Sequence, residues 1–324
     1  MLNFIYWPIS IVLWLWHKLF ALFFGPDNAA SWILAIVLLT FTLRLLLYVP
    51  MRNQQRSMVK MQKVQPRMMA IREKYKNDRQ RMMEETRKLQ KEMGVNPLAG
   101  CLPVFAQIPV FIGLFHVLRS FNRTGDGPGQ VGLSPEENYN TANYVFSVEE
   151  VRSFLDADLF GVPLSSYIAM PRDMWAAFPN AGEFDRWRIV AVAAPLILII
   201  VFATHMNARM SLRRQEKRRA EGKQAAPQSE MMETQQQMMS KLMLWFMPLT
   251  ILFTGVIWHV GMLFYMVSNN IWTFFQNRHI FALVDREEEE EDERIKAKKR
   301  TTAPKPGQKP KNNTKKRGGK NKKK

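Results

Sequence analysis

Apolar residues gather in a few long runs along the chain, and most charged residues lie between these runs. A run of roughly 20 apolar residues is long enough to cross the hydrocarbon layer of a membrane, which is about 30 Å thick. Five runs approach this length, at residues 31–50, 97–121, 187–206, 241–258 and 259–280. The pattern therefore predicts an all-α polytopic membrane protein with a core of five spans.

The first 30 residues contain a further apolar stretch, and its arrangement stays open. It is long enough to cross a membrane, but it contains Pro8, His17 and Lys18. Three tryptophans suit a helix that lies at the membrane interface: Trp7, Trp14 and Trp16. The stretch has no basic leader, no A-x-A-like cleavage site and no cysteine placed for lipidation. We expect residues 1–30 to be retained as an interfacial helix or as a sixth spanning helix.

The segments between the runs differ in charge. Residues 51–96 carry thirteen Lys/Arg against five Asp/Glu, and residues 207–240 are basic as well. Residues 122–186 carry ten Asp/Glu and only four Lys/Arg, with many Gly, Pro, Asn and Ser. Because basic loops stay in the cytoplasm, this distribution places residues 51–96 and 207–240 on the cytoplasmic side. It predicts that residues 122–186 form an ordered or partly ordered external loop.

Within residues 51–96, apolar side chains recur every three or four positions, which predicts two amphipathic helices. The two stripes are Met58, Met61, Val64, Met68, Ile71 and Tyr75, and then Met82, Leu89 and Met93 with Thr86 between them. A turn at residues 76–79 would fold them into an antiparallel cytoplasmic hairpin. Its methionines would form an adaptable docking surface, or they would simply pack inside a solvated coiled coil.

Residues 281–324 begin with an acidic run and continue with fourteen Lys/Arg between Lys296 and Lys324. Gly, Pro, Asn and Thr interrupt the basic part, which predicts a disordered cytoplasmic tail. A polycation binds nucleic acid through counterion release and without base specificity. Ribosomal RNA is therefore a candidate partner of the tail, and anionic lipid is the alternative.

Arg44 is the charged residue inside the first run. An arginine within a span costs about 2.5–3.5 kcal/mol on insertion scales and is usually functional or paired. The simpler interpretation is that its guanidinium reaches the inner interface, because Pro50 lies only about 9 Å away along a helix. The residues alone leave both interpretations open.

The other polar groups inside the runs are amides and one hydroxyl: Gln107, Asn269, Asn270, Thr273 and Gln276. Each could face a polar cavity or could bond to a neighbouring helix. The five histidines lack metal-ligand spacing, and Cys101 is the single cysteine. There is no phosphate-binding loop, nucleophile elbow or pair of intramembrane carboxylates. The sequence therefore predicts no catalytic residues, no metal, no cofactor and no enzyme activity.

Several segments resemble the YidC insertases and their Oxa and Albino relatives. They are "LTFTLRLLLYVP", the long block "QPRMMAIREKYKNDRQRMMEETRKLQKEMGVNPLAGCLPVFAQIPVFIGLFHVLRSF", and "DADLFGVPL", "FMPL" and "SNNIWTFFQNR". The details are most similar to actinobacterial members. The last span departs from the family pattern, which has Pro-Ala-Gly followed by Tyr-Trp: His259, Val260, Gly261, Tyr265 and Met266 occupy these places.

The resemblance implies a membrane protein insertase of the bacterial inner membrane. In that family the matching arginine lies in a hydrophilic groove that is open to cytoplasm and lipid, so Arg44 would pair with short polar segments of nascent membrane proteins. Gln107, Asn269, Asn270, Thr273 and Gln276 would line this groove. The client's helix would slide along an apolar surface that contains Phe105, Phe111, Phe246 and Phe253; from the residues alone, these side chains could equally face lipid. The implied partners are nascent membrane proteins, the Sec translocon, the ribosome and anionic lipids.

Two other classes of protein compete with this interpretation. A small-solute transporter or channel would also place a charge and amides inside spans, but it would need a counter-charge, and no acidic intramembrane residue is visible near Arg44. A membrane tether for nucleic acid would use only the basic tail. It would leave Arg44 and the hairpin unexplained.

Overall fold

The computed structural model describes residues 3–95, 102–125, 131–178, 185–225 and 230–302. They belong to two compact units, residues 1–280 and residues 281–324, and each unit is considered by itself. Helices dominate the described residues of the first unit, and its sheet is the antiparallel pair β1 (Asp158–Leu159) and β2 (Val162–Pro163). The predicted all-α class is confirmed.

The helices of the first unit follow in chain order. They are α1 (Asn3–Phe24), α2 (Ala29–Leu46), α3 (Tyr48–Lys74), α4 (Arg79–Glu92), α5 (Leu102–Arg119), α6 (Pro135–Tyr139), α7 (Val148–Asp156), the 3-10 helix η2 (Asp173–Ala177), α8 (Arg186–Ala220), α9 (Glu230–Lys241), the π-helical turn η3 (Leu242–Phe246), α10 (Met247–Thr254), the 3-10 turn η4 (Gly255–Ile257) and α11 (Val260–Thr302). The last of these continues into the second unit.

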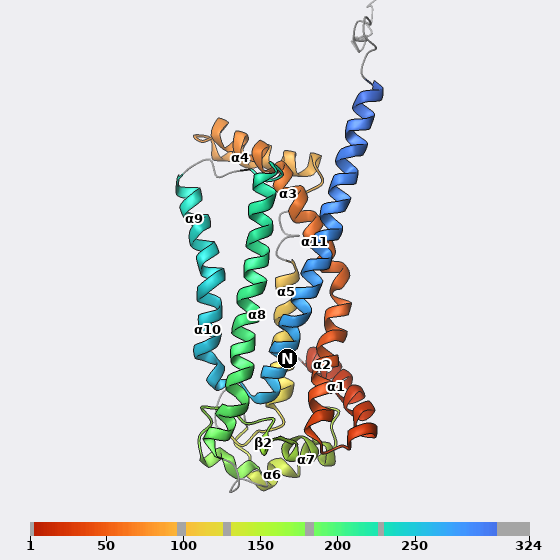
Figure 1. The fold of residues 1–324 in the computed structure, drawn as a ribbon, viewed down its shortest axis with the longest axis vertical. Helices are drawn as coiled ribbons and strands as arrows, with labels where there is room; N and C mark the ends of the chain where they lie inside the picture. Colours follow the sequence, from red (N-terminus) through yellow and green to blue (C-terminus); the bar gives the residue numbers. More distant parts are fainter. Residues whose placement is uncertain (1–2, 96–101, 126–130, 179–184, 226–229, 303–324) are drawn as a thin grey trace, which may run out of the picture. The chain divides into compact units, whose positions relative to one another are not determined.

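Four helical segments of the described residues are long and apolar enough to cross a membrane: α1, α2, α8 and Glu233–Ile257. Helix α5 and the start of α11 cover the other two predicted spans. In Figure 1, α6, α7 and β2 gather at one end of these helices, here called the loop end, and α3 and α4 lie at the other, the hairpin end. The first unit therefore has the architecture of a multi-pass membrane protein.

Proline sets the boundary between α2 and α3. Pro50 has no N–H to donate to the carbonyl of Leu46, four residues earlier, so the hydrogen-bond pattern of a regular helix is interrupted at this point. Helix α2 ends at Leu46 and α3 begins at Tyr48. Residues 48–50, which the sequence pattern assigns to the first span, thus belong to the long helix of the hairpin.

The hairpin helices α3 and α4 pack against each other through the apolar stripes. A turn at residues 75–78 reverses the chain, and Asp78 caps α4 by accepting a hydrogen bond from the Arg81 amide at 3.0 Å. Val64 and Leu89 are buried between the helices together with Val95. Three further residues pack against this small core: Met61, Met68 and Ile71.

The π-helical turn before α10 also follows from a proline. Pro248 cannot donate to the carbonyl of Leu244, so this carbonyl needs another partner. His205 of α8 provides it, with Nδ1 at 3.0 Å from the Leu244 oxygen. A carbonyl only accepts, so Nδ1 carries the proton. Helix α8 itself continues to Ala220, beyond the span expected at residues 187–206.

An aromatic core joins α1 and α2 to the segment expected to be the external loop. Trp32 of α2 is fully buried and lies edge-on to Phe154 of α7, with ring centroids 5.0 Å apart. Its Nε1 donates to Ser153 Oγ at 3.1 Å, and His17 stacks on its ring at 3.6 Å. These contacts make residues 131–178 an ordered part of the fold.

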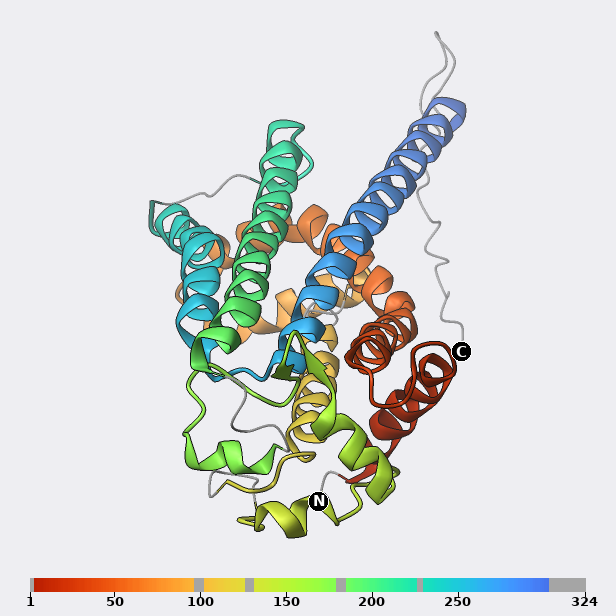
Figure 2. The same cartoon turned by 60° about the horizontal axis from the view of Figure 1, so that its bottom comes forward.

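Helix α1 is tied to the loop end by an acidic side chain. Glu150 Oε1 of α7 accepts from Trp14 Nε1 and pairs with Lys18 Nζ, both at 2.7 Å. Figures 1 and 2 show α1 beside α7. A helix whose middle contacts the loop end suits an interfacial position, although its length and composition would also allow a span. Both alternatives from the sequence stay predictions.

The described part of the second unit is helical, which differs from the disorder expected for residues 281–324. Helix α11 ends at Thr302, and Arg286 pairs with Glu290 one turn later, at 3.1 Å. Glutamate, lysine and arginine favour helices, and such i,i+4 pairs add to this preference. Residues 303–324, with most of the basic tail, lie outside the described residues.

Candidate functional site

Arg44 lies in the last turn of α2 and turns its side chain toward α11. Its Nε and Nη2 both donate to Oδ1 of Asn269, at 2.8 Å and 2.5 Å. The residue is only 7% exposed. The guanidinium is thus enclosed between helices, which separates it from an arginine that simply reaches a polar interface.

Two further neutral groups complete the contacts of this guanidinium. Nη2 donates to Thr273 Oγ1 at 3.2 Å, and Nη1 lies 3.8 Å from the Met51 sulfur. Within the described part of the chain, Arg44 makes no ion pair. Its positive charge is therefore stabilised by dipoles alone, which leaves it able to attract an anion.

A small cavity lies beside the guanidinium, where α2, α5 and α11 meet. Its lining residues are Thr40, Leu43, Arg44, Leu47, Gln107, Val110, Tyr265 and Asn269. The cavity volume of about 10 Å³ is close to the space that one water molecule needs. Gln107 Nε2 donates to the Tyr265 hydroxyl at 3.3 Å across it. Polar groups from three helices thus converge on one point.

We call Arg44, Gln107, Tyr265, Asn269 and Thr273 the arginine site. Tyr265, Asn269 and Thr273 follow one another at intervals of four on α11, so they form one stripe along the helix. Thr273 is held in place because its hydroxyl donates to the Asn269 carbonyl at 2.7 Å. Tyr265 is the member of the arginine site that is not among the groove residues expected from the sequence. Its position on the stripe of Asn269 and Thr273 was the available signal.

Asn270 does not belong to the arginine site. Its Oδ1 accepts from Thr204 Oγ1 at 3.1 Å and from Asn207 Nδ2 at 3.3 Å. Because consecutive residues on a helix are about 100° apart, Asn270 faces α8 while Asn269 faces α2. Its observed contacts join two helices.

Gln276 is buried further along α11. Its Oε1 accepts from Trp272 Nε1 at 3.1 Å, one turn earlier, and its Nε2 makes no hydrogen bond within the described residues. The residue does not line the cavity beside Arg44. Its proposed role in a groove stays a prediction.

The four phenylalanines expected on a sliding surface lie in different environments. Phe246 and Phe253 are exposed, at 58% and 70%, on the segment η3–α10. Phe111 is partly buried and packs on Trp258 and Tyr265, with ring centroids 5.9 Å and 6.3 Å away. The side chain of Phe105 lies outside the described residues.

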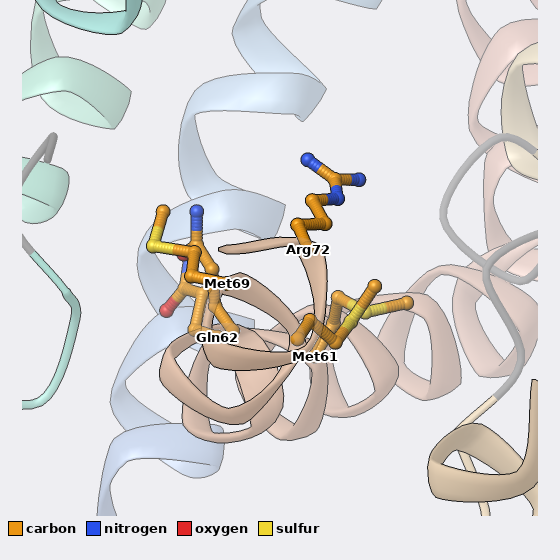
Figure 3. Close-up of a pocket in the computed structure, with 6 residues that line it drawn as sticks. Met61, Gln62, Met69 and Arg72 are labelled. Carbon is orange, nitrogen blue, oxygen red and sulfur yellow. The ribbon is translucent and has the colours of Figure 1, made fainter. Parts of the chain in front are cut away.

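The hairpin carries a second hollow, on α3 (Figure 3). Its volume is about 240 Å³, and its lining residues are Met61, Gln62, Gln65, Met68, Met69 and Arg72. Gln62 also accepts a hydrogen bond from Arg218 Nε of α8 at 2.9 Å. The hollow combines flexible methionines with a basic side chain, which suits contact with an amphipathic partner.

The chain is thus a multi-pass helical membrane protein with a buried arginine between three helices, and this arginine makes no ion pair with the residues that the structure describes. Residues 23–287 match the family described as the 60Kd inner membrane protein. The chain belongs to this family, the YidC and Oxa family of membrane proteins.

Three similar proteins are each named membrane protein insertase YidC. One from Mycobacterium tuberculosis H37Rv is 44% identical over 314 residues, which cover 97% of this chain and 82% of that protein. One from Mycolicibacterium paratuberculosis is 42% identical and covers 97% and 85% of the two chains. One from Mycobacterium leprae is 41% identical and covers 96% and 78%. The resemblance to actinobacterial members is confirmed.

Proposed function

We propose that this protein is a membrane protein insertase that moves short polar segments of nascent membrane proteins across the bacterial inner membrane. The observation that carries the proposal is the buried Arg44, whose charge is held by neutral groups beside a small cavity. The names of the similar proteins support the same activity. No covalent step is needed, and the protein acts as a chaperone rather than as an enzyme.

The proposed mechanism lowers the barrier to moving charge and peptide groups through hydrocarbon. An aspartate at the centre of a span costs about 2.5–3.5 kcal/mol on insertion scales. An acidic segment that enters from the cytoplasm would pair with Arg44 while its adjoining apolar helix slides into lipid. Arginine suits this role because it stays charged at any relevant pH and has five donors. Each 1.4 kcal/mol removed from the barrier speeds insertion about tenfold.

Entry of such a segment requires the arginine site to widen into a groove. The cavity of about 10 Å³ is too small for a carboxylate group. We infer that α2, α5 and α11 separate on the cytoplasmic side when a client arrives. The exposed Phe246 and Phe253 would then provide part of the apolar surface along which the client's helix slides.

The orientation proposed here follows from charge. The hairpin end carries residues 51–96, in which Lys and Arg outnumber Asp and Glu, and the end of α8 is basic as well. Because basic segments stay in the cytoplasm, both would face that side. The loop end, with its excess of acidic residues, faces outward. Arg44 would then lie in the cytoplasmic half of the membrane, near the side from which clients come.

Partners are proposed from the surfaces outside the arginine site. The hairpin would bind clients or the Sec translocon. The protein would act together with the translocon on some clients and alone on others. The basic segment from Lys296 to Lys324 would bind ribosomal RNA, because a polycation gains affinity by releasing counterions. Anionic lipids would compete for the same charges.

Insertion of a single-span client into vesicles that contain the purified protein tests this function. The client carries an acidic external tail, and the vesicles contain the wild type, Arg44→Ala or Arg44→Lys. We expect the wild type to insert the client, Arg44→Ala to be about tenfold slower, and Arg44→Lys to keep most of the activity. Size-exclusion profiles and helix content of each variant control for folding.

Either of two results would count against the proposal. If wild-type vesicles insert the client no better than empty vesicles, the protein is not an insertase for this client class. A flux assay would then test the alternative of a small-solute transporter or channel. Equal activity of wild type and Arg44→Ala would leave insertion in place but would remove Arg44 from the mechanism.

A further inference from the structure

Asn269 occupies the place at which an acidic client would bind. Its single Oδ1 accepts two hydrogen bonds from Arg44, so this oxygen is the principal acceptor of the guanidinium in the structure. Thr273 and Met51 add one longer contact each. Any carboxylate that is to pair with Nε and Nη2 must therefore take the position of the Asn269 side chain.

A neutral amide is a suitable group for a temporary acceptor. A buried guanidinium without acceptors would carry a large desolvation cost, so the empty site needs an acceptor to stay folded. A carboxylate adds the Coulomb attraction of a full negative charge to these hydrogen bonds, and a neutral amide lacks it. An amide thus holds the arginine in the absence of a client and is weak enough to be displaced.

We propose that Asn269 is an exchangeable acceptor that determines the preference of the insertase for acidic segments. The proposal rests on the function proposed above and adds a specificity-determining residue to it. When a client carboxylate arrives, the Asn269 side chain rotates away and the carboxylate takes over the bonds to Nε and Nη2. Thr273 remains in place, because its own hydroxyl bonds to the Asn269 main chain, and it keeps the guanidinium oriented.

The space beside the guanidinium agrees with such an exchange. The adjoining cavity has a volume of about 10 Å³, close to the space that one water molecule needs, so it offers little room for a carboxylate while Asn269 stays where it is. Gln107 and Tyr265 border this cavity and bond to each other at 3.3 Å. They provide polar surface toward which the amide can move without being left unsatisfied.

Two substitutions at position 269 separate exchange from simple support. Asn269→Asp places a carboxylate of nearly the same shape beside Arg44, which neutralises it permanently. Asn269→Ala removes the acceptor and leaves Arg44 with Thr273. Asn270→Asp is the matched control, because it adds the same charge one residue away, where the side chain faces Thr204 and Asn207 instead of Arg44.

The readout is the ratio of insertion rates for two clients that differ only in Asp or Asn residues in the external tail. For the wild type we expect the acidic client to be faster. Asn269→Asp should lower the ratio about tenfold, to that of Arg44→Ala. Asn270→Asp should keep the wild-type ratio within about twofold, and Asn269→Ala should keep it or raise it.

Other outcomes overturn the exchange. If Asn269→Asp gives the same ratio of insertion rates as the wild type, a charge at this position does not compete with the client. A ratio in Asn269→Ala as low as in Arg44→Ala would show that Asn269 only supports the arginine. If Asn269→Ala does not yield a monodisperse protein, the ratios of Asn269→Asp and Asn270→Asp decide: a tenfold loss at position 269 alone supports the exchange, and equal ratios in the two variants overturn it.

Failure of the broader function gives a different pattern. If wild-type vesicles insert neither client above the level of empty vesicles, the insertase function and the exchange fall together. If the wild type prefers the acidic client and Arg44→Ala removes this preference, the function stands. The variants at position 269 then test the exchange by itself.

Discussion

The Glu150 side chain connects α7 at the loop end to Trp14 and Lys18 of α1. We therefore expect its replacement by alanine to lower the stability of the protein. The carboxylate accepts from Trp14 Nε1 and Lys18 Nζ at 2.7 Å and from the Ser147 amide at 2.8 Å. Hydrogen bonds to a charged group contribute about 1.5–3 kcal/mol each when buried. The half-exposed Lys18 adds at most about 1 kcal/mol. We expect Glu150→Ala to lower the free energy of unfolding by about 4 kcal/mol.

The dependence on pH gives this prediction a second, independent part. Burial alone would raise the pKa of the Glu150 carboxyl, but hydrogen bonds from Lys18, the Ser147 amide and Trp14 outweigh it and hold the pKa below its usual value of 4.5. A lowered folded-state pKa means that the stabilisation is complete above pH 4.5 and is lost as pH falls through the folded value. The difference in stability between the wild type and Glu150→Gln should therefore shrink below pH 4.5.

Equilibrium unfolding in mixed micelles, followed by tryptophan fluorescence, measures both parts. Glu149→Ala is the matched control, because the Glu149 side chain is exposed and its loss should cost much less stability than the loss of Glu150. Equal losses in Glu149→Ala and Glu150→Ala would refute the reasoning. So would a difference between wild type and Glu150→Gln that stays constant down to pH 3.

Four further substitutions test the packing and hydrogen bonding of the helices. Trp32→Ala should cost about 3–5 kcal/mol, measured by the same unfolding assay, because it empties the centre of the aromatic core. Gly113→Leu should weaken the contact of α5 with α1, since even a Cβ there would lie 2.5 Å from Ile9 Cδ1, and faster proteolysis of the loop end should report it. His205→Leu should cost about 1–3 kcal/mol by leaving the Leu244 carbonyl unpaired, and Pro248→Ala should reduce this loss in a double-mutant cycle.

The sequence predicts the helical class of the protein well, because long apolar runs and stripes spaced by three or four residues are local signals. Turns and caps are local as well: the Ser147 and Glu150 side chains form a capping box that a reader could find from their spacing. The helix at residues 281–302 differs from the disorder expected from the high charge of this segment. Its glutamates, arginines and lysines are good helix formers, and this propensity is the signal that favours the helix.

The arginine site could be predicted only in part. A charge inside an apolar run points to Arg44, but the sequence contains nothing that separates Asn269 from Asn270. Which of the two meets Arg44 depends on how α11 is rotated against α2 and α8, and this rotation is set by packing over the whole bundle. Tyr265 was missed for a related reason, because an aromatic residue in a span reads as apolar until its hydroxyl is placed.

Position-specific crosslinking of a stalled client tests the central claim, that acidic segments pass beside Arg44, most directly. A photoreactive residue replaces Val110, which lines the cavity, or Ile199, which is exposed on α8. Ribosome-bound clients are then stalled with the acidic segment partly across the membrane. If acidic segments pass beside Arg44, position 110 should crosslink to this segment, position 199 should give few crosslinks, and Arg44→Ala should abolish the crosslinks from position 110. Equal crosslinking from both positions, or crosslinks from position 110 that Arg44→Ala leaves unchanged, would contradict this claim.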